Sequence, residues 1–400
     1  MRAKTSSAVV LLAALGTHGC AAAPPAGAGA PVIPTAAATP TQSPTATPTQ
    51  SLTATATTTP TQSPTAVTTP PKSAAAPLPP PKSTTLALAS GSDSASDRAL
   101  LAGDRAFDQG DLDVAAKSYE TARLAASNKP GPLVGLARVR IARTGLPMDY
   151  ASGKGNREIL AAVRDLRKAA QMDPGFGPAL VELGRGLLLA GDADGAVATL
   201  RRGAGMMTDE AEAHSVLGVA LLATGHRDEA LVELGRAASL DPGSAARHGN
   251  LGTVLFMNGR VADAVNEYEI QVRLADDDSR AHSDLGTALL ASEDATRAVA
   301  ELRRAIALDP SHAAYHSNLG YAMQSQGMRR EAIAEYEAAL RLDPQLSSAW
   351  INLATILARD PKTRAEARAA LETAKKIDPS DPRVKANLEE LDALEKGAPP

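Results

Sequence analysis

Four histidines stand at a regular spacing of 34 residues: His214, His248, His282 and His316. Histidine is a common zinc ligand, and zinc requires its ligand nitrogens about 2.0–2.1 Å from one point. If the period is helical, equivalent positions fall on different helix pairs, and packed helix axes lie about 8–10 Å apart. We therefore expect no metal site. We expect each imidazole to pack between helices with a hydrogen bond, as Trp350 would at the same position.

Motifs of nucleophilic, metal-dependent and phosphate chemistry are missing from the sequence. It contains no P-loop, no G-x-S-x-G and no H-E-x-x-H. The net charge is −4, and no basic patch with interleaved aromatics indicates nucleic-acid binding. We therefore expect no catalytic residues and no cofactor, and we predict that the protein is not an enzyme and does not bind nucleic acid.

The only cysteine, Cys20, follows a short apolar run near the start of the chain. Arg2 and Lys4 form a positively charged region, and residues 8–15 read AVVLLAAL. That run has the length of a signal-peptide core and is too short to span a bilayer. Together with Gly19 before the cysteine, this pattern resembles the signal of bacterial lipoproteins.

The lipoprotein resemblance implies a signal peptide over residues 1–19 and a lipid on Cys20 that anchors the protein to a membrane. Ala21 after the cysteine implies the outer membrane, with the protein facing the periplasm. Thr17 departs from the pattern, which usually has a branched aliphatic residue there. The alternative is ordinary signal cleavage, which would leave a secreted or periplasmic soluble protein.

Residues 20–95 are rich in threonine, proline and alanine and repeat the octet TPTQSPTA with small changes. Such a composition cannot bury enough apolar surface to fold. We expect a disordered linker that holds the remainder of the chain away from its anchor. The density of threonine leaves a glycosylated stalk as the alternative.

A repeat of 34 residues organises the second half of the chain. The segments from Ala211, Ala245, Ser279 and Ala313 share Leu-Gly at positions 7 and 8 and alanine at position 20. Each segment contains two helical patterns separated by a turn, and three of them end in Leu-Asp-Pro, which stops a helix. A fixed period of this length indicates a stacked solenoid.

This pattern resembles the tetratricopeptide repeat, and the resemblance implies an all-α, right-handed α–α superhelical solenoid. In register, the chain holds eight repeats: 96–129, 130–176, 177–210, 211–244, 245–278, 279–312, 313–346 and 347–381. The second repeat carries an inserted polar loop at 146–156. Residues 382–396 then form a capping helix, which gives the solenoid a polar end.

In this family the first helices of successive repeats line a concave groove that binds peptides. The resemblance places small residues, short amides, one acid and a modest apolar strip there. An asparagine can donate and accept, so a row of asparagines matches the groups of a peptide backbone. In the alternative, these asparagines cap or bridge neighbouring helices. The predicted groove residues are Ser215, Asn250, Thr253, Phe256, Ser283, Asp284, Thr287, Ser317, Asn318, Tyr321 and Asn352.

The predicted function is a protein–protein interaction scaffold of the bacterial cell envelope that binds a partner polypeptide in its groove. By resemblance, it would help to assemble a secretion, pilus or outer-membrane complex. The alternative is a regulatory or adaptor subunit that recruits an envelope enzyme, either a glycosyltransferase or a peptidoglycan hydrolase.

Overall fold

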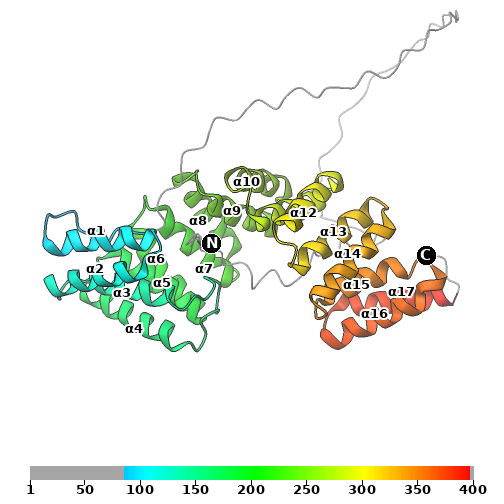
Figure 1. Cartoon of the computed structure of the whole chain (residues 1–400), viewed down its shortest axis with the longest axis horizontal. Coiled ribbons are helices and arrows are strands. Elements are labelled where there is room, and N and C mark those ends of the chain that lie inside the picture. Colours follow the sequence, from blue (N-terminus) through cyan, green and yellow to red (C-terminus); the bar gives the residue numbers. More distant parts are fainter. Residues whose placement is uncertain (1–84, 397–400) are drawn as a thin grey trace, which may run out of the picture. The chain divides into compact units, whose positions relative to one another are not determined.

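The computed structural model describes residues 85–396, and all regular structure within them is helical (Figure 1). Eight helical hairpins follow one another, and the single helix α17 (Pro382–Glu395) closes the series. This arrangement confirms the predicted all-α solenoid of about eight hairpins with a capping helix. The predicted signal peptide, Cys20 and most of the predicted linker lie outside the described residues.

The first helix of each hairpin is called the A helix and the second the B helix. The A helices are α1 (Ala95–Asp108), α3 (Gly131–Ala142), α5 (Gly177–Ala190), α7 (Ala211–Ala223), α9 (Ala245–Met257), α11 (Ser279–Ala291), α13 (Ala313–Ser325) and α15 (Ser347–Leu357). The B helices are α2 (Leu112–Ala125), α4 (Arg157–Met172), α6 (Ala193–Met206), α8 (Arg227–Leu240), α10 (Val261–Leu274), α12 (Ala295–Leu308), α14 (Arg329–Leu342) and α16 (Arg364–Ile377). A short 3-10 helix, Pro361–Thr363, precedes α16.

Six of the eight hairpins turn through one residue in the left-handed conformation; the second hairpin has a long loop, and the last turn, between α15 and α16, contains no such residue. Glycine fills it in five hairpins, because glycine has no Cβ to clash there. In the sixth hairpin, Glu293 takes the same place with φ of 65°. A non-glycine residue is strained in this conformation. The five glycines, with φ between 74° and 86°, are Gly110, Gly191, Gly225, Gly259 and Gly327.

The two helices of a hairpin approach closely because a glycine of the A helix faces a large residue of the B helix. A Cβ added to Gly218 would lie 2.5 Å from Cγ of Leu234, and one added to Gly320 would lie 2.8 Å from Cδ1 of Tyr336. Leu234 and Tyr336 are fully buried. The Leu-Gly pair of the repeat therefore sets the distance between the helices.

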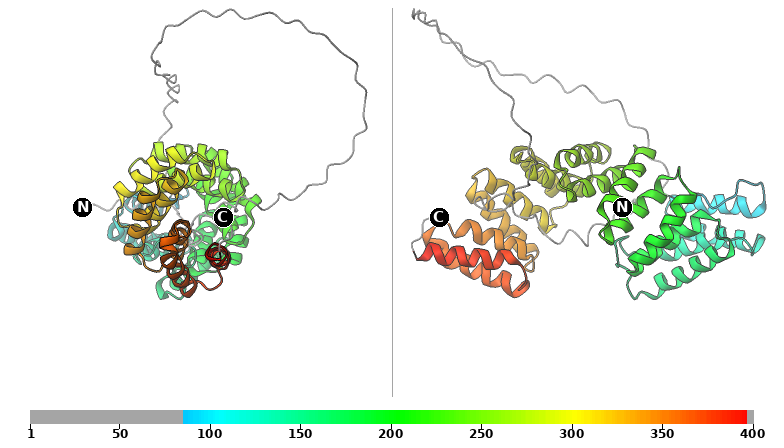
Figure 2. Two further views of the ribbon diagram at one scale, coloured as in Figure 1. Left: turned by 90° about the vertical axis from the view of Figure 1, so that its right-hand side faces the viewer. Right: turned by 180° about the vertical axis from the view of Figure 1, so that it is seen from behind.

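Each helix packs mainly against the helices before and after it, as two further views show (Figure 2). In addition, every A helix contacts the A helix of the next hairpin. The B helices of the described residues chiefly contact A helices. The A helices therefore form a continuous inner layer of the stack, and the B helices form the outer layer.

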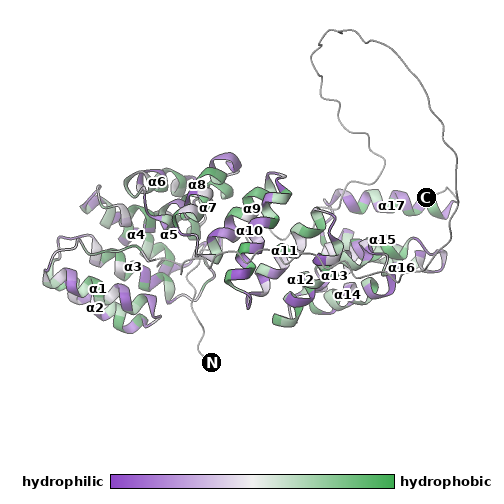
Figure 3. Cartoon of the chain, turned by 90° about the horizontal axis from the view of Figure 1, so that it is seen from above, coloured by the Kyte–Doolittle hydropathy of each residue, from purple (hydrophilic) through white to green (hydrophobic). Residues whose placement is uncertain are grey.

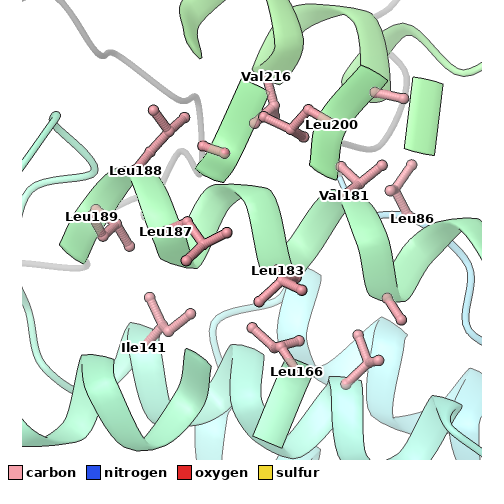
Figure 4. Close-up of a cluster of buried hydrophobic side chains, with 14 of the residues drawn as sticks. Leu86, Ile141, Leu166, Val181, Leu183, Leu187, Leu188, Leu189, Leu200 and Val216 are labelled. Atoms are coloured by element: carbon pink, nitrogen blue, oxygen red, sulfur yellow. The ribbon is translucent and has the colours of Figure 1, made fainter. Parts of the chain in front are cut away.

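Most helices carry separate hydrophobic and hydrophilic stripes, so the apolar side of each meets its neighbours (Figure 3). Leucine and alanine dominate the core, in which Leu183 of α5 faces Leu166 of α4, while Leu200 of α6 lies on the other side of α5 (Figure 4). The chain contains only 2% aromatic residues, so close helix packing has to rest on these smaller side chains. None of the helices in residues 85–396 is long and apolar enough to cross a membrane.

The inserted loop 146–156 connects α3 to α4 and folds back onto the end of α5. Its backbone amides at Ala151 and Gly153 donate to the carbonyls of Leu188 and Leu189, at 3.0 and 2.9 Å. The Leu188 carbonyl also accepts from the amide of Gly191, so the loop adds to the bonds that end α5. The loop is thus attached to the third hairpin as well as to its own.

The predicted linker 20–95 is wrong at its C-terminal end. In the described part of it, Leu86 and Leu88 pack on the solenoid and are only 3% and 2% exposed, while residues 90–94 are exposed. The run Leu86-Ala87-Leu88 alternates large and small residues, which suits a half-buried extended segment. The average composition of the linker conceals this local pattern.

Candidate functional site

The inner layer carries a chain of buried ion pairs through its first five A helices. Arg138 of α3 lies 3.4 Å from Asp104 of α1 and 2.7 Å from Glu182 of α5. Glu182 lies 2.9 Å from Arg185, which also pairs with Glu212 of α7. We call this series the ion-pair chain. Its members are Asp104, Arg138, Glu182, Arg185, Glu212, Arg247 and Asp241.

The ion-pair chain ends on α9. Arg247 lies 3.0 Å from both Glu212 and Asp241, and the Arg247 and Glu212 side chains are 3% and 4% exposed. Burial alone would raise the pKa of Glu182, but the adjacent Arg185 and Arg138 outweigh it and lower that pKa. A buried charge is tolerated when it is paired and hydrogen-bonded in this way. These side chains are therefore engaged with each other on the inner layer.

Our sequence reasoning missed the ion-pair chain. Asp104, Arg138 and Arg185 share position 9 of their repeats but differ in charge, and the other members lie at other positions, so a search for one recurrent residue type does not find them. The usable signal was the alternation of basic and acidic residues over positions that face the same layer, such as Arg138, Glu182 and Glu212. That signal emerges only when each repeat is compared with the next.

Each of the four histidines joins its own A helix to the following B helix and to the turn before its hairpin. Nδ1 of His214 lies 2.6 Å from Oε2 of Glu233 on the following B helix, and Nε2 lies 3.1 Å from the carbonyl oxygen of Thr208. His248, His282 and His316 repeat both contacts. The expected hydrogen bond is present, and the carboxylate is a partner that our sequence reasoning missed. The pairs are His214–Glu233, His248–Glu267, His282–Glu301 and His316–Glu335.

The last hairpin shows what replaces such a pair. Trp350 takes the histidine position, and its Nε1 donates to the carbonyl of Pro344 at 2.9 Å. The residue at the glutamate position is then Ala370. Because an indole nitrogen only donates and has no second ring nitrogen, no carboxylate is needed. The histidines thus belong to the packing of the repeat.

Four of the predicted groove residues are buried in the stack. Ser215, Asn250, Ser283 and Ser317 are 3%, 6%, 6% and 4% exposed. Their side chains offer almost no surface to a ligand. The other seven predicted residues, on α9, α11, α13 and α15, are intermediate in exposure: Thr253, Phe256, Asp284, Thr287, Asn318, Tyr321 and Asn352.

Some of these partly exposed residues also bridge helices. Nδ2 of Asn318 donates to Oγ1 of Thr287 on the previous A helix at 3.3 Å. Oγ1 of Thr253 accepts from the hydroxyl of Tyr268 at 3.1 Å. The bridging role that was the alternative for the asparagines therefore holds at Asn318, which is partly exposed.

Asp284 is the acidic group of this surface. Its side chain is 30% exposed, and its Oδ2 lies 3.6 Å from Nε of Arg280 one turn earlier. Burial among the helices raises its pKa to about 6, and Arg280 only partly opposes the shift. A cation placed beside this carboxylate would favour its ionised form.

Models of the tetratricopeptide repeat match residues 156–220, 221–286 and 313–346, and a further model described as a TPR repeat matches residues 286–327. The comparison with curated proteins gives no match. Together these four matches cover residues 156–346, from α4 to α14.

Among solved structures, the crystal structure of the APC/C hetero-tetramer Cut9–Hcn1 is similar, with a TM-score of 0.54 and 18% identity. The match covers 76% of this chain, and it spans only 57% of that one. MamA 41-end from Desulfovibrio magneticus RS-1 has a TM-score of 0.40 and 22% identity over 42% of this chain and 95% of that chain.

YrrB, described as a TPR protein with an unusual peptide-binding site, has a TM-score of 0.39 and 21% identity over 48% of this chain and 97% of that chain. At these identities the likeness concerns the fold alone. The repeat models supply the assignment: residues 156–346 of this chain are tetratricopeptide repeats.

Proposed function

We propose that the protein is an interaction scaffold that binds an extended segment of a partner polypeptide on the inner layer of α9, α11, α13 and α15. The observation that carries this proposal is the row of partly exposed polar residues on consecutive A helices. Asp284, Asn318 and Asn352 occupy the same position of three successive repeats. We call these three residues the polar row.

The spacing of the polar row suits an extended chain. Neighbouring helices lie about 8–10 Å apart, and an extended strand advances about 3.3 Å per residue. One repeat therefore meets about every third residue of a bound segment. An asparagine amide can pair with either group of a peptide unit, so Asn352 would recognise backbone largely independent of sequence, and Asn318 would do so by exchanging its bond to Thr287.

Asp284 adds a preference for a basic residue in the bound segment. Its carboxylate is partly buried and only partly compensated by Arg280. A lysine or arginine of the partner would gain a charged hydrogen bond there, and such bonds are about twice as strong as neutral ones. The first four hairpins contrast with this surface, because their inner-layer charges are already engaged in the ion-pair chain.

The test uses the double variant Asn318→Ala/Asn352→Ala of the full chain. A dodecapeptide selected on the wild-type protein from a random display library serves as the probe. Loss of two backbone hydrogen bonds should weaken its binding about tenfold or more, with unchanged helicity. Asn266→Ala, an exposed asparagine on the outer helix α10, is the matched control and should bind as the wild type does. Equal affinity of the double variant and the wild type would refute the proposal.

We also propose that this scaffold acts at the bacterial envelope, held by a lipid on Cys20. The support is the signal-like sequence before Cys20 and the long threonine- and proline-rich stretch after it. Two acyl chains would anchor the protein firmly, since each buried methylene contributes about 0.8 kcal/mol. Growth with a tagged palmitate should label the wild type and leave Cys20→Ala unlabelled. Absence of label from both would exclude the anchor.

A further inference from the structure

The chain places one of its own segments on the inner layer of the first three hairpins. Residues 85–92, which we call the leading segment, are non-helical and precede α1. Exposure alternates along it, with Leu86 buried, Ala87 exposed and Leu88 buried. This period of two is that of an extended strand lying with one face on a surface.

Two charged groups of the repeats bind the backbone of the leading segment. Nη2 of Arg138 donates to the carbonyl oxygen of Leu86 at 2.8 Å. The amide of Leu88 donates to Oδ2 of Asp104 at 3.1 Å. The two bonds are made to Leu86 and Leu88, which lie on the same face of the segment. Both involve main-chain groups, which any extended peptide also presents.

The leucine side chains enter an apolar floor made by the repeats. Leu86 belongs to the same buried cluster as Val181 of α5, and the close-up labels the two near each other (Figure 4). The carbonyl of Leu88 lies so close to α3 that a Cβ on Gly131 would be 3.0 Å from it. Glycine at position 131 therefore leaves the space that the segment fills.

The receiving groups are held in place by the repeats themselves. Nε of Arg138 donates to Glu182 at 2.7 Å, and the hydroxyl of Tyr119 donates to Oδ1 of Asp104 at 2.8 Å. Neither contact involves the leading segment. The site thus keeps its geometry from helices α1, α2, α3 and α5, and it would present one donor and one acceptor if the segment left.

A short connection holds the leading segment at this site. Ser90 Oγ and Ser92 N donate to Oδ2 of Asp97 in the first turn of α1, both at 2.8 Å. A ligand tethered over so few residues has a high effective concentration, in the millimolar range for short flexible linkers. An external peptide must compete with it.

We propose that the inner layer of the first three hairpins is a second peptide-binding site. It is specific for an extended segment in which one residue separates two leucines, and residues 85–92 occupy it as an intramolecular ligand. The partner is therefore a polypeptide with a Leu-x-Leu segment. Its binding displaces the leading segment. This site is separate from the polar row and does not depend on it.

The test uses a fluorescein-labelled peptide with the sequence of residues 84–92, TTLALASGS, and the full-length chain. The variant Leu86→Ser/Leu88→Ser weakens the internal ligand. It should bind the peptide about tenfold or more tighter than the wild type, because the competitor is lost. Ala87→Ser, at the exposed position, is the matched control and should bind as weakly as the wild type. A peptide with serine at both leucine positions should not bind the variant.

Two outcomes would overturn the proposal: equal binding of the leucine and serine peptides to the double variant, or no gain over the wild type. If the double variant fails to fold, amide hydrogen exchange of the wild type decides. A detachable ligand requires the Leu88 amide to exchange faster than the slowest amides of α3 and α5. Equal protection would make the segment an integral part of the core and refute the proposal. Asn318→Ala/Asn352→Ala should leave TTLALASGS binding unchanged.

Discussion

His282 meets an acceptor at both ring nitrogens: Nδ1 lies 2.7 Å from Oε2 of Glu301, and Nε2 lies 3.1 Å from the carbonyl oxygen of Asp276. A carbonyl oxygen can only accept, so Nε2 must carry a proton. Nδ1 lies within hydrogen-bond distance of the carboxylate, so the ring connects α11 to its own B helix and to the end of the preceding hairpin.

Removing the Glu301 carboxylate should destabilise the protein unless His282 is replaced as well. Glu301→Ala leaves Nδ1 of a nearly buried imidazole without its partner, which should lower the free energy of unfolding by about 1–3 kcal/mol. His282→Trp/Glu301→Ala reproduces the arrangement of Trp350 and Ala370 and should recover most of that loss. Thermal melts followed by circular dichroism compare the two. A double variant less stable than the single one would show that the Trp350 arrangement cannot be transferred.

The hairpin turn at Glu293 offers a stabilising change. Glu293 has φ of 65°, where five other hairpins have glycine. Glu293→Gly should raise the free energy of unfolding by about 0.5–1 kcal/mol, since it relieves the clash of Cβ with the backbone. Gly259→Ala is the reverse change at an equivalent turn and should lower it. The midpoint of urea unfolding measures both, and a lower midpoint for Glu293→Gly would contradict the strain.

Two helical glycines should respond oppositely to the same substitution. Gly218→Ala places Cβ 2.5 Å from Cγ of buried Leu234, and such overpacking typically costs about 1–3 kcal/mol. Gly235→Ala meets nothing within 4 Å on α8 and should stabilise by about 0.5–1 kcal/mol through helix propensity. Melting temperatures that shift in the same direction would show that hairpin spacing does not depend on Gly218.

Asp284 should make stability depend on pH. Burial raises its pKa to about 6 in the folded chain from an ordinary value of 3.8, so between these pH values the folded state binds one more proton than the unfolded state. Its contribution to stability is therefore present below about pH 4 and is lost as pH rises through 6.

Asp284→Asn removes that dependence. At pH 7.5 the variant should be more stable than the wild type by about 1–3 kcal/mol, with Arg280 and partial exposure reducing the gain. At pH 4 the two should agree. Asp277→Asn, at an exposed position, controls for the loss of one negative charge. Urea unfolding at both pH values provides the comparison, and a difference that is the same at pH 4 and pH 7.5 would rule out titration of Asp284.

The hairpins were predictable because the residues that determine each hairpin lie within one repeat. Leu-Gly, alanine at position 20 and the closing Asp-Pro act within 34 residues, so one sequence suffices to find them. The accessible surface was harder to predict. Position 5 carries small residues such as Ser283 because it is buried, and small size alone does not distinguish a groove floor from a packed helix contact.

Contacts between repeats were the least visible in the sequence. Arg138 pairs with Asp104, one repeat period before it, and with Glu182, 44 positions after it, and neither partner lies within the repeat of Arg138. The end of the linker was misjudged for a similar reason. The sequence around Leu86 does not indicate its burial, because its hydrogen-bond donor, Arg138, lies 52 positions later. Only the three-dimensional arrangement brings these partners together.

The histidines have a mechanical consequence. Each ring grips the carbonyl that ends the preceding hairpin, through Thr208, Pro242, Asp276 or Pro310, while its other nitrogen holds the B helix of its own hairpin. These four equivalent sets of hydrogen bonds therefore set the angle between one hairpin and the next. Substitution of one histidine would weaken these bonds and let the two neighbouring hairpins change their angle. The stiffness of the central hairpins therefore depends on each histidine separately.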